Sequence, residues 1–278
     1  MAEPLAAPSM SSFEGIPVEY EKLGVFRTPP LASMSLDSVE PLRPASSVSS
    51  LSRSVIHTII ASGAGSIGGF IQSPGGIWLL TANHVIAGNG RLTHFEQPGD
   101  GILAGNPPAL VSRQVRFIDI DGSPAAVNPA DAAICVLDPG LQPVHPLFPA
   151  SWNMVDGTPA RPQKGDTVRF LTRTGQEQAG TVEAPSGVFP VRLNLSGGVD
   201  EAVFGGQILI RASQGSFLRP GDSGSLVVLD TPTGTRPLGI AFAFPDNPSQ
   251  SSMGLVSPLG VILEQLRPHT GGATSILV

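Results

Sequence analysis

Cysteine, charge and long apolar runs are all scarce in this chain of 278 residues. The one cysteine, Cys135, cannot pair within the chain, which excludes a fold held together by internal disulfides and favours a reducing compartment. The first residues carry neither a basic segment nor an apolar core of signal-peptide length. The sequence therefore predicts a cytoplasmic protein.

Basic residues are too few and too scattered to mark a nucleic-acid surface. The 16 lysines and arginines never form a run of three, and the formal net charge is −6. Apolar runs stay well short of the roughly 18 to 20 residues that a membrane-spanning helix needs. We expect neither a nucleic-acid nor a membrane partner.

Metal and cofactor motifs are also missing. The histidines are dispersed, and no pair of residues shows the spacing of a metal site: His57, His84, His94, His145 and His269. No metal is expected. Glycines at 63, 65 and 68 satisfy G-x-G-x-x-G, but a strand-like run and a Pro-Gly-Gly turn follow where a phosphate site needs a helix. We interpret them as a hairpin with close backbone packing, and no cofactor is predicted.

Two carboxylates, Asp119 and Asp121 in "FIDIDG", share one face if this segment is a strand. Because Gly122 follows at once, a solvated strand end that enters a turn is favoured over acid–base chemistry.

Glycine and proline are abundant instead, with 33 and 28 copies, which indicates many short elements joined by tight turns. Two sets of strand-like runs, with no helical segments between them, predict an all-β fold of two packed antiparallel barrels. The apolar spacing of "PLGVILEQLR", which begins with proline, predicts a C-terminal helix.

We divide the chain by composition and pattern. The expected parts are an irregular N-terminal extension at 1–51, which lacks any strand or helix period, a first barrel at 52–150, a second barrel with the C-terminal helix at 151–267, and a tail at 268–278.

The stretch "RPGDSGSLVV" places Ser223 in a turn between two glycines. A serine hydroxyl becomes a nucleophile only with a base, an orienting group for that base, and donors for the oxyanion. The chain offers these in order: His84 closes the apolar run of "LLTANHV", and Asp131 opens the strand-like run of "DAAICVL". The amides of Gly221 and Ser223 can serve as the donors.

The motifs "TANHV", "DAAI" and "GDSGS", in this order and at these spacings, resemble those of the chymotrypsin/trypsin-like serine peptidases, over about residues 52–267. The resemblance is greatest to non-secreted members without disulfides. It implies two six-stranded barrels and a serine endopeptidase that acts through an acyl-enzyme. It also implies His84 as the base, Asp131 as the orienting group, Ser223 as the nucleophile, and the Gly221 and Ser223 amides as the oxyanion hole.

The same resemblance places four residues at the pocket for the side chain before the scissile bond: Phe217, Ala241, Ala243 and Phe244. The run "GIAFAF" at 239–244, which holds the last three, resembles the strand that pairs with the substrate backbone. All four are apolar, which favours an uncharged or apolar substrate residue. Asp222, beside the nucleophile, is implied to be structural, and its partner stays open.

Two alternatives also stay open. The domain could be catalytically silent and serve as a peptide-binding or scaffold module. The N-terminal extension could act as a pro-segment that limits activity until it is cut near Arg27, Arg43 or Arg53, by this enzyme or by another.

Overall fold

The computed structural model describes residues 12–13, 16–17, 26–27, 47–53, 59–86, 95–97, 109–117, 127–137, 143, 147–195, 198–247, 250–272 and 275–278. The predicted strand end at Asp119 and Asp121, and the histidines His57, His94 and His145, lie outside these residues.

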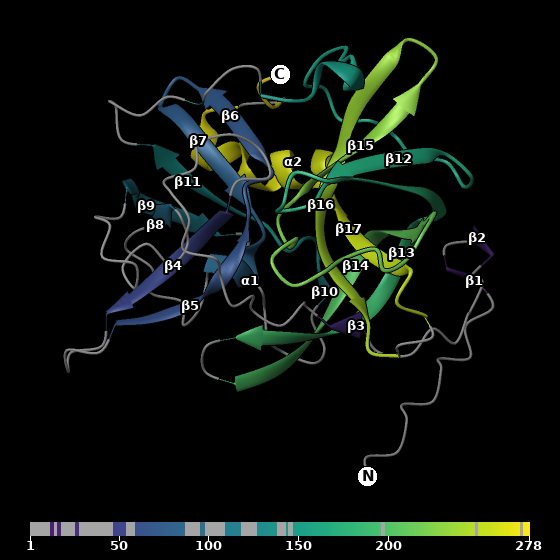
Figure 1. The fold of residues 1–278 in the computed structure, drawn as a ribbon, viewed down its shortest axis with the longest axis horizontal. Helices are drawn as coiled ribbons and strands as arrows, with labels where there is room; N and C mark the ends of the chain where they lie inside the picture. The colour runs from purple at the N-terminus through teal and green to yellow at the C-terminus, as the bar shows by residue number, and fades with distance from the viewer. Residues whose placement is uncertain are drawn as a thin grey trace.

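The described strands form two large sheets that lie side by side (Figure 1). The sheet of the N-terminal half has seven strands, in the order β5 (Ile59–Ser66), β4 (Ser47–Arg53), β8 (Phe95–Gln97), β9 (Ala109–Phe117), β11 (Ala133–Leu137), β7 (Gly76–Thr81) and β6 (Gly69–Ser73). All of its pairings are antiparallel.

The sheet of the C-terminal half has eight strands, in the order β10 (Val127–Asn128), β14 (Gly198–Ala212), β17 (Met253–Pro258), β16 (Gly234–Pro245), β15 (Leu226–Thr231), β12 (Thr167–Leu171), β13 (Glu177–Leu195) and β3 (Phe26–Arg27). β13 also pairs with β14, and β3 also pairs with β16. Only the pairings of β10 with β14 and of β3 with β13 are parallel among those described for this sheet.

The all-β class is confirmed, but each sheet has more than the expected six strands. Two of the strands in the C-terminal sheet, β3 and β10, have only two residues each and come from segments without a clear period in the sequence. β4 begins at Ser47, inside the expected N-terminal extension, and β3 brings Phe26–Arg27 of that extension to the other sheet. A separate pair joins β1 (Ser12–Phe13) to β2 (Ile16–Pro17).

Helices are few among the described residues: α1 (Asn83–Ile86), the 3-10 turn η1 (Ala150–Trp152) and α2 (Leu259–Thr270). The expected C-terminal helix is confirmed and runs three residues beyond Arg267, with Pro268 inside it. It ends at Gly271, whose φ of 66° suits glycine. None of the described helices combines the length and the apolar character needed to cross a membrane.

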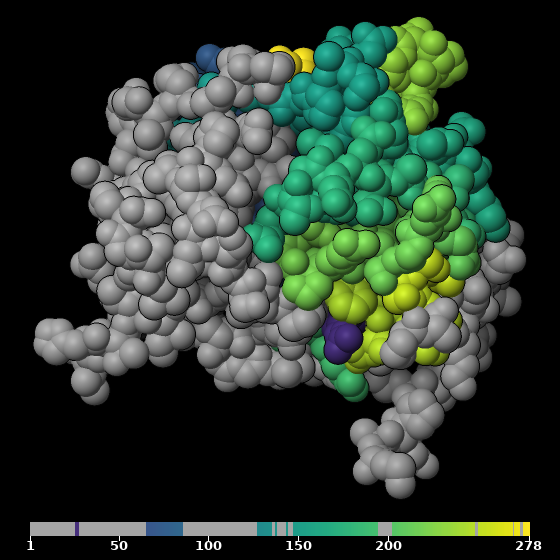
Figure 2. All heavy atoms as spheres, viewed as in Figure 1, coloured from purple at the N-terminus to yellow at the C-terminus, as the bar shows by residue number. Residues whose placement is uncertain are grey.

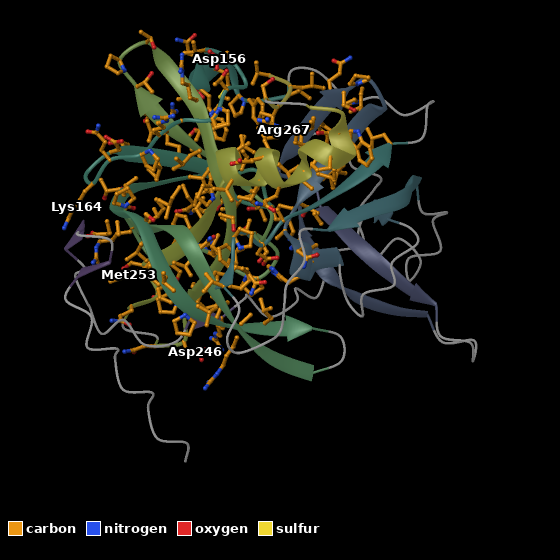
Figure 3. All side chains as sticks on the ribbon, turned by 180° about the vertical axis from the view of Figure 1, so that it is seen from behind. Asp156, Lys164, Asp246, Met253 and Arg267 are labelled. Atoms are coloured by element: carbon orange, nitrogen blue, oxygen red, sulfur yellow. The ribbon has the colours of Figure 1, made fainter. Side chains whose placement is uncertain are left out.

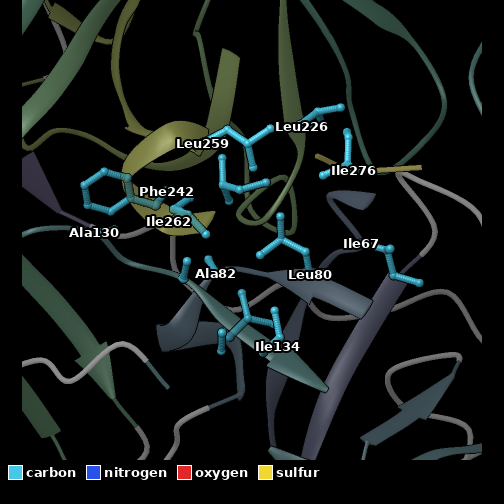
Figure 4. Packing of buried hydrophobic residues seen from close by; sticks show 14 of the residues in the cluster. Ile67, Leu80, Ala82, Ala130, Ile134, Leu226, Phe242, Leu259, Ile262 and Ile276 are labelled. Atoms are coloured by element: carbon cyan, nitrogen blue, oxygen red, sulfur yellow. The ribbon is translucent and has the colours of Figure 1, made fainter. Parts of the chain in front are cut away.

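One apolar core holds the two sheets together (Figure 4). Leu80 and Ile134 contribute to it from the first sheet, Leu226 and Phe242 from the second, and Ile262 from α2. A second cluster lies within the C-terminal sheet. Because the shared core excludes water between the sheets, residues on their facing edges are held in fixed positions.

The end of the tail also ties the two halves together. The amide of Leu277 donates to the carbonyl of Phe70 at 2.7 Å, and that of Ile276 donates to Gly157 at 3.1 Å. The Ile276 side chain is buried in the shared core. The tail expected at 268–278 is therefore part of the packed structure, where it is described.

Candidate active site

His84 lies on α1, directly after β7 ends at Thr81. Thr81 donates its hydroxyl to the carbonyl of Ser66 at 2.8 Å, which fixes the end of the strand against β5. The His84 side chain is almost fully buried. The turn after β7 thus presents the imidazole at the junction between the sheets.

Asp131 precedes β11 and contacts His84 twice. Its Oδ1 accepts from the backbone amide of His84 at 3.0 Å, and its Oδ2 lies 2.5 Å from Nδ1 of the ring. An acceptor at this position favours the tautomer with the proton on Nδ1, so that Nε2 keeps its lone pair. The sequence-based pairing of these two residues therefore has the geometry of an oriented base.

Residues of the C-terminal sheet hold this aspartate in place. The Asp131 amide donates to Oγ of Ser257 at 3.0 Å, and Ser257 donates to Oε1 of Gln207 at 2.8 Å. Gln207 in turn donates to the carbonyl of Pro129 at 2.9 Å. Sequence reasoning missed Ser257 and Gln207, because polar residues of long strands give no signal of a partner so far away in the chain.

Ser223 lies in the turn before β15. The amide of Asp222 donates to Arg219 at 3.0 Å, and that of Ser225 donates to Asp222 at 3.0 Å. The φ of Gly221 is 91°, a backbone conformation for which glycine is suited. The turn buries Oγ of Ser223, which has no hydrogen-bond partner, and so no such bond to His84 is present.

Three glycines let the turn that holds Ser223 (the nucleophile turn of the proposal below) lie against the N-terminal sheet. Gly65 and Gly68 belong to the glycine-rich motif. A Cβ on Gly65 would lie 2.6 Å from the carbonyl oxygen of Ser223, and one on Gly68 would lie 2.5 Å from that of Gly224. Gly224 itself faces Ser66 and Thr81. The close backbone packing expected for the motif is present, and it brings the motif into contact with the turn that holds Ser223.

Ser66 fastens the turn from the same side. Its amide donates to the carbonyl of Ser223 at 2.7 Å, and its hydroxyl donates to the carbonyl of Gly221 at 2.8 Å. With both carbonyls held on one side, the amides of Gly221 and Ser223 donate no hydrogen bond within the described residues. Two free donors therefore lie beside a buried hydroxyl.

The partners of Asp222, left open by the sequence, are two backbone amides. Oδ1 accepts from Arg173 at 2.8 Å, and Oδ2 accepts from Arg219 at 2.9 Å. Burial raises the pKa of this carboxyl above its usual value, although the two amides and the nearby guanidinium groups oppose that effect. Asp222 thereby ties the start of the turn to the segment after β12.

The four expected pocket residues do not line one open space. Phe217 is buried 5.0 Å from the ring of Phe170, in the same cluster as Ala241. Ala243 belongs to the core between the sheets, and Phe244 is partly buried at the end of β16. The ring of Phe217 fills the space in front of Gly254, where a Cβ would overlap it.

No described group of histidine, cysteine or acidic residues has the arrangement of a metal site. An open hollow of about 590 Å³ lies between Leu147–Ala150, Asn153–Met154 and Val278. None of the expected site residues lines it.

No family model matches the chain, and no curated protein matches it by sequence. Solved structures do match. A glutamic acid specific serine protease with a histidine triad in substrate binding is 15% identical, with a TM-score of 0.51 over 84% of this chain and 98% of that one. A Nocardiopsis protease is 14% identical, with a TM-score of 0.51 over 81% and 96% of the two chains.

An alpha-lytic protease homolog is 16% identical, with a TM-score of 0.51 over 84% of this chain and all of that one. At these identities the similarity speaks for the fold, since a fold can host several functions. The described chain has the fold of the chymotrypsin-like serine proteases.

Proposed function

We propose that the protein is a serine endopeptidase with His84, Asp131 and Ser223 as its catalytic residues. The observation that carries this proposal is the buried contact of 2.5 Å between His84 Nδ1 and Asp131 Oδ2, beside the turn that buries Ser223. A histidine oriented in this way can accept a proton at Nε2. Catalytic hydrogen bonds are often long in unliganded sites, so the absence of a bond between Ser223 and His84 fits an enzyme without substrate.

The reaction is an acyl transfer in two halves. Oγ of Ser223 attacks the carbonyl carbon of the scissile bond while its proton moves to Nε2 of His84. The tetrahedral intermediate collapses as the C–N bond breaks, and the same proton leaves with the amine. Water then attacks the ester, passes one proton through His84 to Ser223, and releases the acid.

The negative oxygen of each tetrahedral intermediate needs donors that are already in place. We assign this role to the amides of Gly221 and Ser223, which make no other hydrogen bond within the described residues. A single donor of this kind is worth about 2.7 to 4 kcal/mol in the transition state.

We infer that the substrate residue before the scissile bond is short and uncharged. The apolar ring of Phe217 is buried against Phe170 and covers Gly254, which takes up room at the pocket's expected base. None of the four expected pocket residues carries a carboxylate that could pair with a basic substrate residue. We therefore assign cleavage after small apolar residues such as alanine or valine.

A fluorophosphonate probe tests the assignment of the nucleophile. Wild-type protein is expected to form a covalent adduct and to cleave peptides, whereas the Ser223→Ala variant does neither. Ser225→Ala is a matched control, since Ser225 is also buried in this turn and its Oγ also has no partner. Labelling that survives in Ser223→Ala would show that the assignment is wrong.

The unpartnered Oγ of Ser223 also favours a second function, a silent domain that binds peptides without cleaving them. Folded wild-type protein that does not react with the probe, but binds an extended peptide by calorimetry, would support this alternative over the first.

A further inference from the structure

A short strand from the N-terminal part of the chain lies on the strand expected to bind substrate. β3 pairs antiparallel with the end of β16, with Arg27 opposite Phe244 and Phe26 opposite Pro245. It also pairs in parallel with Val191 and Arg192 of β13. Figure 2 shows these two residues in purple, set among the green and yellow spheres of the C-terminal sheet.

The edge that β3 covers is the one on which the nucleophile turn lies. The amide of Ala241 donates to Ser225 at 3.0 Å, and its carbonyl accepts from Gly224 at 2.9 Å, so its polar groups face that turn. The register with β17 then shifts across Phe242. A bulge adds one residue and reverses the alternation of the strand, so Phe244 faces the same edge as Ala241.

Both residues of β3 are anchored. Phe26 is fully buried, and its ring meets Phe189 edge-on at 5.2 Å. Nε of Arg27 lies 3.1 Å from Oδ1 of Asp246, and its guanidinium lies 5.1 Å from the centre of the Phe244 ring. The back view places Asp246 at the lower end of the C-terminal sheet (Figure 3). β3 is therefore held by side-chain packing as well as by backbone pairing.

We propose that Phe26–Arg27 is an internal competitor of the substrate, which occupies the peptide-binding edge of β16 until a substrate displaces it. The inference rests on the proposed peptidase function and adds its regulation. One edge of a strand can pair with only one partner. A strand of the same chain competes at a high effective concentration and lowers the apparent affinity of any peptide that needs this edge.

The antiparallel pairing carries a further consequence. Because β16 runs from Ala241 near the nucleophile turn to Pro245, its antiparallel partner runs toward that turn. β3 therefore follows the direction in which an extended substrate would approach Ser223. Competition is expected for substrates that have three or more residues before the scissile bond, and not for reagents that reach only Ser223.

Two reagents on the full chain separate these cases: a fluorophosphonate, and a fluorogenic tetrapeptide ending in alanine. Arg27→Pro removes an amide from β3 and keeps Phe26. It is expected to raise kcat/KM for the tetrapeptide about tenfold, mainly through KM, with an unchanged rate of labelling. Arg27→Ala, which loses only the side-chain contacts, should raise it about threefold.

Arg236→Ala is the matched control. Its side chain has an exposure similar to that of Arg27 and pairs with Asp156, far from β3 in the sheet. It should change neither reaction. If kcat/KM for the tetrapeptide in Arg27→Pro is unchanged or lower while labelling is normal, the proposal that β3 competes with substrate is wrong. If the wild-type chain is not labelled at all, the proposed peptidase function is wrong instead.

Hydrogen exchange tests the pairing of β3 with β16 without any measurement of activity. In the Ser223→Ala chain, the amide of Phe244 should exchange at least tenfold faster when Arg27→Pro is added, because its cover is lost. Amides of β12 should keep their rates, which shows that the fold is intact. Equal exchange at Phe244 in both chains overturns the proposal.

Discussion

Oδ2 of Asp131 lies 2.5 Å from Nδ1 of His84, and both side chains are almost completely withdrawn from water. A carboxylate and an imidazole in such a place can be held only by further hydrogen bonds. The carboxylate accepts such a bond from the backbone amide of His84, and the backbone amide of Asp131 itself donates to Oγ of Ser257.

Exchange of the carboxylate for an amide should disable the base without disturbing the packing. In Asp131→Asn, the new NH2 group favours the tautomer that protonates Nε2, so that His84 cannot accept the proton of Ser223. We expect kcat/KM for peptides to fall about 10⁴-fold. Thermal unfolding serves as the control, and a Tm lowered by many degrees would trace the loss to folding instead.

Ser257 is a positioning residue that acts through Asp131. Ser257→Ala leaves the amide of Asp131 and Oε1 of Gln207 without a partner, which should lower the free energy of unfolding by about 1 to 3 kcal/mol. It should also lower kcat with little change in KM, because the tilt of the imidazole changes and the peptide-binding edge does not. Ser257→Thr keeps the hydroxyl and should restore kcat. A variant that loses stability alone would contradict this role.

The raised pKa of Asp222 predicts a dependence of stability on pH. Because the folded-state pKa lies above the ordinary value of an aspartate, 3.8, the folded protein binds this proton more tightly than the unfolded one. The stabilising contribution of Asp222 is present below pH 3.8 and is lost as the pH rises through the folded-state pKa. The free energy of unfolding of the wild type, measured with urea, should therefore fall relative to that of Asp222→Asn as the pH rises over that range. If the two free energies change with pH in parallel, the raised pKa is contradicted.

Phe217 should limit the size of the substrate residue. Phe217→Ala opens space in front of Gly254, so the ratio of kcat/KM for phenylalanine over alanine before the scissile bond should rise about tenfold or more. Loss of the buried ring should also cost about 3 to 5 kcal/mol of stability. Phe170→Ala, which removes the neighbouring ring, is the control: it should lose stability and keep the wild-type preference.

Gly65 should tolerate no side chain. A methyl group there meets the carbonyl oxygen of Ser223 at 2.6 Å, and a backbone atom held by Ser66 cannot move aside freely. Gly65→Ala is expected to cost about 1 to 3 kcal/mol of stability and to slow probe labelling. In Gly69→Ala, where the nearest atom is 3.6 Å away, labelling should stay as in wild type.

Local patterns were sufficient to predict the class of the fold and to name candidate residues for the site. Alternating apolar runs bounded by glycine and proline mark most of the longer strands, and α2 carries its own apolar spacing. His84, Asp131 and Ser223 each end or begin such a run, so their motifs are readable one at a time.

Contacts between distant segments were not readable in the same way. The amides that bind Asp222, the chain from Asp131 through Ser257 to Gln207, and the pairing of Phe26–Arg27 with β16 all join residues far apart in the sequence. Almost every residue has a backbone amide, so the sequence does not show which amide will bind Asp222. A strand of two residues is too short to show an alternating pattern. The sequence by itself therefore determined which residues could react, whereas only the packing of the two sheets decided what orients Asp131, what satisfies Asp222, and what covers the edge of β16.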